Sequence, residues 1–476
     1  MKDRTRAVLT PENRWFALVV LCVGFLMIIL DSTIVNVALP SIQTDLALSS
    51  DGLAWVINAY LIAFGGLLLL AGRVGDLIGR RQVFLAGLAL FTFASLLCGF
   101  AAEAWQLIAA RFLQGVGGAL ASAVILGMIV TMFPTPREQA KAIAVFSFVG
   151  SAGASLGLLL GGVLTQLLSW HWIFFVNVPI GVVAFVLARP LLAREPGLGL
   201  RAGADVPGAV LVTAALMLAV YTIVDAESWL LGGVAFALLA LFVARQATAE
   251  RPLLRLGLLK SRDVVGANVV QMVAVAGMLG MSFLAVLYLQ RVLGYDAFTT
   301  GVSFLPISLA IGVLSLGFSA RLIMRFGARL VLLPALALMA VGLFLLGQAG
   351  VDGQYWVDVL PALLLMGVGA GLVIPALMTL AMAGVAPQDS GLASGLINTT
   401  QQVGGAFGIA ILASVAARES GGGEDPASLV AGYSAAFELA AALAAAALVM
   451  AVVVLRRRPA VAAEAAVEEP AVAVTV

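Results

Sequence analysis

The sequence predicts an all-α integral membrane protein, and three observations support this class. Of the 476 residues, 62% are hydrophobic and only 11% are charged, whereas soluble domains carry about 25% charged residues. Apolar stretches recur along the chain with the roughly 20 residues that a helix needs to cross a bilayer. Lys and Arg residues gather in alternate connections between these stretches, which is typical of proteins that cross a membrane many times.

The apolar stretches and the polar breaks between them predict fourteen spanning helices. Their predicted limits are 15–37, 53–71, 82–101, 106–132, 140–168, 172–190, 206–224, 229–245, 264–290, 299–320, 330–348, 357–384, 392–416 and 432–455. The first stretch is too long for the apolar region of a signal peptide, so we expect it to be retained as the first span. No connection is long enough to hold a soluble domain.

The distribution of basic residues orients the chain. If the N-terminus is cytoplasmic, 23 of the 26 Lys and Arg residues fall before the first helix, in loops on the same side, or after the last helix. Only Arg291 and Arg418 fall in connections on the other side, and Arg111 lies within a span. A different number of helices would destroy this alternation, so both termini are predicted to be cytoplasmic.

The composition argues against several classes of function. A formal net charge of +1 offers no electrostatic basis for binding nucleic acid. The chain has no phosphate-binding G-x-x-x-x-G-K-[ST] motif, one histidine, and two cysteines, Cys22 and Cys98, that both lie in apolar runs. We therefore expect no cofactor, no metal site and no enzymatic activity, and any active transport is expected to use an ion gradient.

Two charged stretches resemble each other. "AGRVGDLIGRR" (71–81) follows the second predicted helix and "SARLIMRFGAR" (319–329) follows the tenth. Secondary transporters are often built from such repeats, with the binding site between them. The predicted organisation is a six-helix bundle in 1–195, two inserted helices in 196–262, a second six-helix bundle in 263–456 and a disordered cytoplasmic tail in 457–476. The alternative is that two basic cytoplasmic loops have converged on Gly and Arg.

Asp31 is a carboxylate inside the first predicted helix. It lies about six residues from the outer end of that helix, which is roughly 9 Å at 1.5 Å per residue. Arg111 lies at a similar depth in the fourth helix, and pairing two opposite charges there avoids the cost of burying each alone. We interpret Asp31 as a proton-coupling site with Arg111 as its partner. Burial favours the protonated form of the carboxyl group and the neighbouring guanidinium favours its ionised form, so the group can exchange a proton. A static ion pair that only fixes packing is the alternative.

A second intramembrane carboxylate lies in the last predicted helix. Glu438 is about six residues from the outer face. It is a weaker candidate for a second proton or cation site, and a position at the membrane interface is the alternative.

Two predicted helices are rich in glycine. In the fifth, Gly153, Gly157 and Gly161 recur every four residues and form a stripe along which another helix can approach closely. The thirteenth combines glycines with "NTTQQ" (398–402), whose amides and hydroxyls must face protein or a wet cavity. The candidate substrate-cavity residues in this stretch are Asn398, Thr399, Gln401 and Gln402.

Five stretches resemble motifs of one family, the fourteen-helix drug:proton antiporters (QacA/EmrB-like) of the major facilitator superfamily. They are "LDSTIVNVALP", "GRVGDLIGRR", "RFLQGVGGA", "GASLGLLLGG" and "SGLASGLINTTQQVGGAFGIA", in this order along the chain. The resemblance covers nearly the whole chain. It implies the major facilitator superfamily fold, with two six-helix bundles plus two inserted helices, in the cytoplasmic membrane of a bacterium.

The resemblance also implies roles for individual residues. Asp31 matches the family's proton-coupling position, and Arg111 matches its intramembrane arginine. The loop after the second helix matches a signature that stabilises one conformation by docking on the other half; its residues are Gly72, Asp76, Gly79, Arg80 and Arg81. The antiporter motif of the fifth helix is represented by Gly153, Gly157, Gly161 and Gly162. The chain departs from the family at Leu158, where the motif has proline, and at His171, where arginine is usual.

The expected function is therefore proton-coupled efflux of hydrophobic, often cationic compounds or antibiotics by alternating access. The expected partners are these small molecules, protons and membrane lipids, with the protein acting as a monomer. One alternative is a transporter dedicated to a single metabolite such as an amino acid, siderophore or sugar. A non-transporting membrane receptor is the second alternative.

Overall fold

The computed structural model describes residues 11–133, 135–194, 196–199, 203–224, 229–250, 252–254, 257, 260–382, 390–423 and 425–455, and these fold as helices joined by short connections. The predicted tail 457–476 lies outside the described residues. The first part of the chain forms α1 (Pro11–Asp45), α2 (Ser50–Ile78), α3 (Arg80–Gly99), α4 (Ala104–Met132), α5 (Pro136–Leu167), α6 (Trp172–Phe175) and α7 (Asn177–Leu191). Next come α8 (Val206–Val224) and α9 (Trp229–Thr248).

The remainder begins with α10 (Arg262–Leu287), the π-helical turn η3 (Tyr288–Val292), α11 (Ala297–Ser303), α12 (Leu305–Val313), the π-helical turn η4 (Leu314–Phe318) and α13 (Ser319–Phe326). It continues with α14 (Ala328–Gly347), the π-helical turn η5 (Tyr355–Val359), α15 (Leu360–Met382), α16 (Ser390–Glu419) and α17 (Pro426–Val454). Local sequence explains several boundaries. The side-chain oxygens of Ser49, Asp296 and Asp425 accept backbone N–H groups at helix starts. Pro306 lies in the first turn of α12, where the N–H that proline lacks would have no partner within the helix.

Twelve helices in the described part of the chain are long and apolar enough to cross a membrane, judged by length and composition. The other two predicted spans, 140–168 and 299–320, overlap the shorter apolar segments Leu156–Leu167 and Ala297–Val313. The first of them belongs to the continuous helix α5, whereas the second is divided among α11, α12, η4 and α13. The predicted all-α membrane class is confirmed, and the total of fourteen spans stays a prediction.

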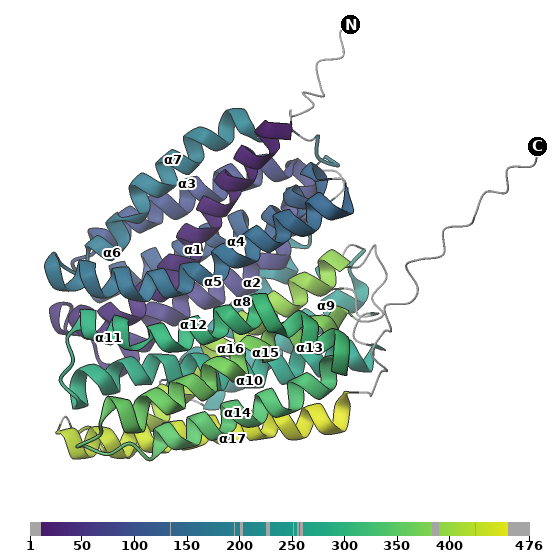
Figure 1. Cartoon of the computed structure of the whole chain (residues 1–476). Coiled ribbons are helices and arrows are strands. Elements are labelled where there is room, and N and C mark those ends of the chain that lie inside the picture. Colours follow the sequence, from purple (N-terminus) through teal and green to yellow (C-terminus); the bar gives the residue numbers. More distant parts are fainter. Residues whose placement is uncertain are drawn as a thin grey trace, which may run out of the picture.

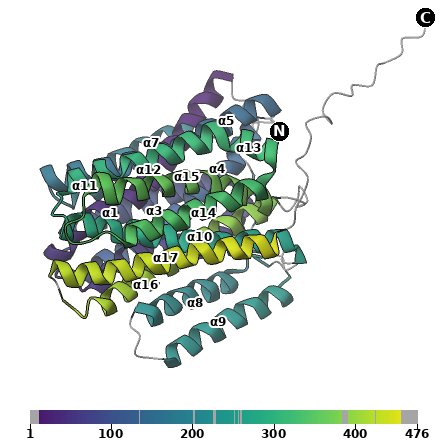
Figure 2. The same ribbon diagram turned by 60° about the horizontal axis from the view of Figure 1, so that its bottom comes forward.

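The helices form two bundles that lie side by side (Figure 1). Helices α1 to α7 pack on one another in the upper part of the view, and α10 to α17 pack in the lower part. Helices α8 and α9 lie together at one edge, where α8 packs against both α2 and α16 (Figure 2). Helix α1 begins and α17 ends on the same side of the molecule. We call this the terminal side and the opposite one the far side.

The two bundles share a structural detail at equivalent places. Gly79 joins α2 directly to α3 with φ 104°, and Gly327 joins α13 directly to α14 with φ 84°. Both values lie in the region that residues with a side chain rarely adopt, which explains glycine at each turn. Two residues later, Arg81 donates to the carbonyl oxygen of Arg189 near the end of α7, and Arg329 donates to that of Val452 near the end of α17, at 2.8 Å. In each bundle an arginine therefore satisfies a carbonyl at the end of the last helix.

The connection between α7 and α8 is attached to the end of α2. The last carbonyl groups of a helix have no partner within the helix. Here the backbone N–H of Leu198 donates to Asp76 O at 2.9 Å, and that of Gly199 donates to Leu77 O at 3.0 Å. Arg73 Nε also donates to the carbonyl of Gly203 at 3.2 Å. The segment that leads into α8 thus completes the hydrogen bonding of α2.

Helices α8 and α9 are joined by a buried carboxylate. Asp205 precedes α8 and accepts hydrogen bonds from the Gly208 backbone N–H at 3.0 Å, Arg245 Nε at 2.5 Å and Gln246 Nε2 at 2.8 Å. Burial would raise the pKa of Asp205, but the hydrogen bonds from Arg245, Gln246 and the Gly208 backbone outweigh it and hold this pKa below its ordinary value. The ionised carboxylate therefore holds the ends of both helices together.

Replacing Asp205 with Asn is expected to loosen α8 from α9. The change removes the ion pair with Arg245, whose side chain is 39% exposed and stays in contact with water, and weakens the hydrogen bonds to the buried position 205, at a cost of about 1 kcal/mol. Hydrogen exchange should accelerate in α8 and α9 and stay unchanged in α3 and α4, and Asp352→Asn on an exposed loop serves as the control. Because the folded pKa is lowered, the wild-type contribution is complete above the ordinary value of 3.8 and is lost as pH falls through the folded value. Unchanged exchange in Asp205→Asn would contradict this role.

The bundles meet closely on the far side, where α5 crosses α11. A methyl group added to Gly162 would lie 2.6 Å from the carbonyl oxygen of Ala297, and one added to Gly301 would lie 2.5 Å from that of Leu158. These contacts leave no room for any side chain at either glycine. The backbones of the two bundles therefore touch at this crossing.

Polar contacts reinforce the far-side closure. Gln166 Nε2 of α5 donates to the Asp296 carboxylate at 3.1 Å, and Gln290 Nε2 donates to the Val37 carbonyl of α1 at 2.9 Å. Farther toward the terminal side, about four turns before Gly162, the side chain of Phe148 on α5 is 55% exposed. The contacts of α5 with α11 and of Gln290 with α1 thus close the far side.

Candidate functional site

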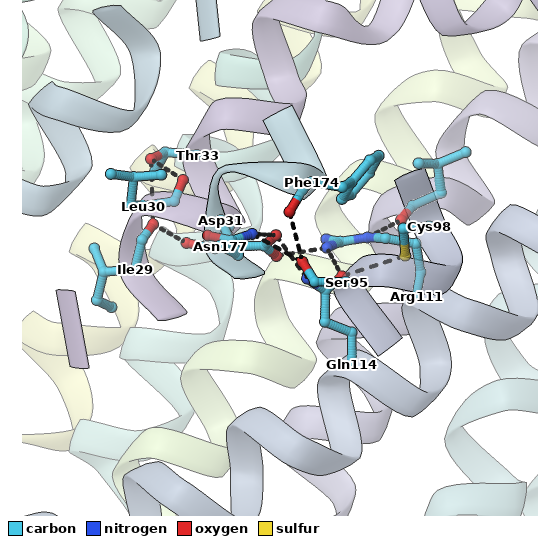
Figure 3. A network of polar contacts seen from close by, with 12 residues as sticks. Ile29, Leu30, Asp31, Thr33, Ser95, Cys98, Arg111, Gln114, Phe174 and Asn177 are labelled. Atoms are coloured by element: carbon cyan, nitrogen blue, oxygen red, sulfur yellow. Dashed lines mark hydrogen bonds and ion pairs between the residues drawn. The ribbon is translucent and has the colours of Figure 1, made fainter. Parts of the chain in front are cut away.

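The structure brings Asp31 of α1 and Arg111 of α4 into contact at the centre of the first bundle (Figure 3). Arg111 Nη1 lies 2.6 Å from Asp31 Oδ2, and the side chains of Arg111 and Asp31 are 1% and 0% exposed, respectively. Similar depth in the sequence could suggest this pair but could not establish contact. The role of the pair in proton coupling stays a prediction.

Two neutral amides complete the surroundings of the Asp31 carboxylate. Gln114 Nε2 of α4 donates to Asp31 Oδ1 at 2.7 Å, and Asn177 Nδ2 of α7 donates to the same oxygen at 2.8 Å. Both amides also lie 3.0 Å from Ser95 Oγ of α3, and this hydroxyl donates to the Phe174 carbonyl at 3.2 Å. With three donors on its two oxygens, Asp31 is surrounded by groups that favour its ionised form.

The Arg111 guanidinium is held from three further directions. Its Nη1 donates to Gln114 Oε1 at 2.7 Å, and its Nε donates to the Val56 carbonyl of α2 at 3.0 Å. Its Cζ lies 4.4 Å from the centre of the Tyr60 ring, within the range of a cation–π contact. Arg111 therefore keeps neutral partners that do not depend on the charge of Asp31, so a change in that charge leaves the guanidinium anchored.

Gln114, Ser95 and Asn177 are site residues that were not predicted from the sequence. Gln114 follows Arg111 by one helical turn within the quoted "RFLQGVGGA", and a polar residue beside an intramembrane arginine is a usable signal. Ser95 and Asn177 are isolated polar residues in apolar runs. Their distance in sequence from Asp31 gave no indication that α3 and α7 bring them to the same point.

Replacing Asn177 with Leu is expected to lower the stability of the first bundle. Asp31 would lose a donor in a buried place, at a cost of about 1.5–3 kcal/mol for a hydrogen bond to a charged group. Asn58 provides a matched comparison for which the expected change in Tm has the opposite sign. Its side chain is 0% exposed and its amide has no hydrogen-bond partner among the described residues. Thermal unfolding in detergent should show a lower Tm for Asn177→Leu and an equal or higher Tm for Asn58→Leu. A higher Tm for Asn177→Leu would contradict the network described above.

The predicted switch-loop residues lie around the turn at Gly79. Arg80 pairs with Asp76 at 3.4 Å and donates to the Gly127 carbonyl of α4 at 3.2 Å. Arg81 satisfies the end of α7, and Gly72 has no heavy atom within 4 Å of an added methyl group. These contacts lie within the first bundle. The predicted docking of this loop on the second bundle stays a prediction.

The glycines of the fifth helix face two different neighbours. Added methyl groups at Gly153, Gly157 and Gly161 would meet α1, at 2.9 Å from Leu26, 2.0 Å from Thr33 and 2.6 Å from the Ile34 carbonyl oxygen, respectively. Gly162 instead faces α11 of the second bundle. The stripe therefore packs α5 on the helix that carries Asp31, and its last member contacts the other bundle.

The candidate cavity residues of α16 divide in the same way. Gln402 packs against Gly65 of α2, and Gln401 Oε1 lies 3.4 Å from Gln271 Nε2 of α10. Thr399 Oγ1 is buried, with no hydrogen-bond partner among the described residues, whereas the side chain of Asn398 is exposed. This stretch therefore packs against α2 of the first bundle and forms polar contacts with α10 of the second.

Glu438 lies apart from the Asp31 network. It is exposed on α17 of the second bundle, where Gln348 Nε2 donates to its carboxylate at 3.4 Å. A cation site at Glu438 stays a prediction. Within the described residues, no group of three or more His, Cys, Asp or Glu side chains could hold a metal ion.

Comparison with known proteins gives the family. The sequence profile of the Major Facilitator Superfamily matches residues 21–409. The chain is 39% identical over 444 residues to the puromycin resistance protein of Streptomyces alboniger, covering 90% of this chain and 88% of that protein. It is 38% identical over 433 residues to the cephamycin export protein of Amycolatopsis lactamdurans, covering 88% of each.

Comparison of structures agrees on the fold. A bacterial homologue of the human lysosomal transporter Spinster, solved in an inward-facing and unoccupied conformation, superposes with a TM-score of 0.66 at 15% identity, covering 93% of this chain and 97% of that one. A multi-pass helical membrane fold is shared, and the prediction of a transporter rather than an enzyme is confirmed. The chain belongs to the major facilitator superfamily.

Proposed function

We propose that this chain is a proton-coupled efflux transporter of the fourteen-helix drug:proton antiporter branch, in the cytoplasmic membrane of a bacterium. The names of its relatives, which refer to puromycin resistance and cephamycin export, support a small-molecule cargo. In this proposal the terminal side is cytoplasmic, α8 and α9 are the inserted helices, and a monomer is the working unit. The structure then corresponds to a state closed toward the outside.

The observation that carries the proposal is the buried Asp31–Arg111 pair. When the far side opens, a proton from outside binds an Asp31 carboxylate oxygen and neutralises it. The attraction to Arg111 and the hydrogen bonds from Gln114 and Asn177 then weaken, while Arg111 keeps Val56 O and Gln114 Oε1. After the protein reopens inward, loss of the proton to the cytoplasm restores the network. In this cycle Asp31 takes up a proton from the outside and releases it to the cytoplasm in each turnover.

The two bundles supply the movement that this cycle needs. The crossing of Gly162 with Ala297 closes the far side without interlocking side chains, so it can separate and re-form. The glycine contacts of α5 with α1 place the moving helix directly beside the helix that carries Asp31. A change in the Asp31 network can therefore reach the crossing of α5 with α11 through the contact between α1 and α5. The crossing itself would be the two-state element, closed in one conformation and open in the other, that alternating access requires.

Proton flux measured in vesicles tests this function. Purified protein is reconstituted with a pH-sensitive dye inside, and a panel of antibiotics and lipophilic compounds is added under an imposed pH gradient. We expect at least one compound to cause protons to move across the membrane in the direction opposite to the compound. We also expect a protonophore to abolish accumulation of that compound. Compound movement that is unaffected by the pH gradient and the protonophore would contradict proton coupling.

A further inference from the structure

Two side-chain amides, Gln271 and Gln401, lie together where α10 meets α16, with Asn398 one turn before Gln401 on α16, and none of the three belongs to the Asp31 network. Gln271 Nε2 lies 3.4 Å from Gln401 Oε1 and 3.5 Å from the Ile397 carbonyl oxygen, both at the long limit for a hydrogen bond. Asn398 follows Ile397 directly and its side chain is exposed. The amide of Gln271 is thus held loosely by the protein, although its side chain is 1% exposed.

The direction in which these amides point follows from the contacts of α16. Ser414 Oγ donates to the Ile223 carbonyl of α8, so that face of α16 looks toward the inserted pair. Gly405 lies on a different face, where an added methyl group would meet Leu279 of α10 at 2.4 Å and Leu61 of α2 at 3.7 Å. Asn398 precedes Gly405 by seven residues, or about two turns, so it shares that face.

The exposed side chain of Asn398 therefore lies on the face of α16 that is directed toward both bundles. This face lies between α2 of the first bundle and α10 of the second, away from α8. Asn398 lies on the terminal half of α16, toward the same side of the molecule as the exposed Phe148 of α5. In the proposed orientation a cargo entering from the cytoplasm reaches Asn398 before the buried Gln271.

The same region offers no charge to a cargo. Away from the ends of the predicted spans the sequence places only two carboxylates, Asp31 and Glu438. Asp31 is 0% exposed and already accepts hydrogen bonds from three side chains. Glu438 is exposed on α17, toward the far end of that helix. A cation leaving water here would lose its hydration without gaining a counter-charge, which is unfavourable in a low-dielectric site.

We propose that the cargo is an uncharged, hydrogen-bonding compound, and that Gln271, Asn398 and Gln401 bind its amide, hydroxyl or carbonyl groups. This proposal rests on the efflux function proposed above and narrows its substrate class, replacing the expectation of cationic compounds. Neutral amides can both donate and accept, so one cluster suits cargoes with different arrangements of polar groups. The apolar residues around the cluster accommodate the rest of the molecule.

The test compares two sets of compounds of similar mass in energised cells. One set consists of neutral amide-bearing compounds, with chloramphenicol as the reference, and the other of permanent cations, with tetraphenylphosphonium as the reference. We expect wild-type protein to export the neutral set in a protonophore-sensitive manner and the cations at background. Gln271→Leu and Gln401→Leu are expected to lower export of the neutral set by about tenfold, the effect of losing roughly one buried hydrogen bond. Gln354→Leu on an exposed connection is the matched control.

A gain of function protects the test against variants that merely fold poorly. Gln401→Glu places a carboxylate in the cluster, so export of tetraphenylphosphonium should rise above background while export of chloramphenicol falls. Export of the cations by wild type at rates equal to the neutral set, or unchanged export in both Gln→Leu variants, overturns this inference and leaves proton-driven efflux standing. Absence of protonophore-sensitive export for both sets overturns the proposed function and this inference together.

Discussion

Replacing Asp31 with Asn is expected to abolish proton-driven export while the protein still binds its cargo. Asparagine has nearly the same shape and can still accept a hydrogen bond through its carbonyl oxygen, but it cannot take up a proton in the working pH range. The cargo cluster on α10 and α16 contains no part of the Asp31 network, so binding should persist. Accumulation against a gradient in vesicles should fall to the level of vesicles without protein at every pH.

The same substitution leaves the Arg111 guanidinium buried without its counter-ion, at a cost of about 3–5 kcal/mol in stability. A variant that lacks export only because it unfolds must therefore be recognised. The double variant Asp31→Asn/Arg111→Gln removes the unpaired charge as well and should recover much of the lost Tm, since the two sites are directly coupled. It should nevertheless show no proton-driven export. Retained accumulation in Asp31→Asn at wild-type rate would eliminate the coupling role.

Replacing Gly162 with Val is expected to stop export for a different reason. A methyl group at this position would lie 2.6 Å from the Ala297 carbonyl oxygen and 2.8 Å from Phe298 Cα. Both atoms belong to the backbone of α11 and cannot move aside as a flexible side chain could. Overpacking of this kind costs about 1–3 kcal/mol. A cost of about 1.4 kcal/mol changes the equilibrium constant between the closed and open states tenfold. The population closed on the far side should therefore fall by about tenfold.

Labelling can separate this conformational defect from misfolding. A cysteine introduced as Leu158→Cys, beside the contact with Gly301, should react with a membrane-impermeant maleimide faster in the Gly162→Val background than in wild type. The two native cysteines, Cys22 and Cys98, are buried. Gly312→Val is the control, because an added methyl group there has no heavy atom within 4 Å. Equal labelling rates and full export in Gly162→Val would show that the crossing does not close the far side.

The Asp31 network shows how far sequence reasoning reached into the site. Asp31 and Arg111 were found because a charge within an apolar run is costly unless it has a partner or a function. Gln114, Ser95 and Asn177 carry no charge, and a polar neutral residue in a membrane helix has a much smaller cost. Only the packing of α3, α4 and α7 around α1 showed that their polar groups converge on one carboxylate.

The glycines give a similar lesson. Their four-residue spacing predicted close approach of another helix, but it could not identify the helix. The structure assigns Gly153, Gly157 and Gly161 to α1 and the adjacent Gly162 to α11. A change of one residue rotates the direction of a side chain by about 100° around a helix, so neighbouring glycines serve contacts within one bundle and between bundles.

By itself, the sequence determined that this chain is a helical membrane protein with two deep charges in its first bundle, because apolar length and the cost of burying charge are local properties of a segment. The matching glycine turns at Gly79 and Gly327 could also be suspected from sequence, since a direct helix-to-helix turn has few alternatives. The tertiary structure alone decided which helices pair across the two bundles, which side is closed, and where the neutral amides gather. These features depend on contacts between residues far apart in the chain, and a hydrophobic surface that suits lipid equally well suits many neighbouring helices.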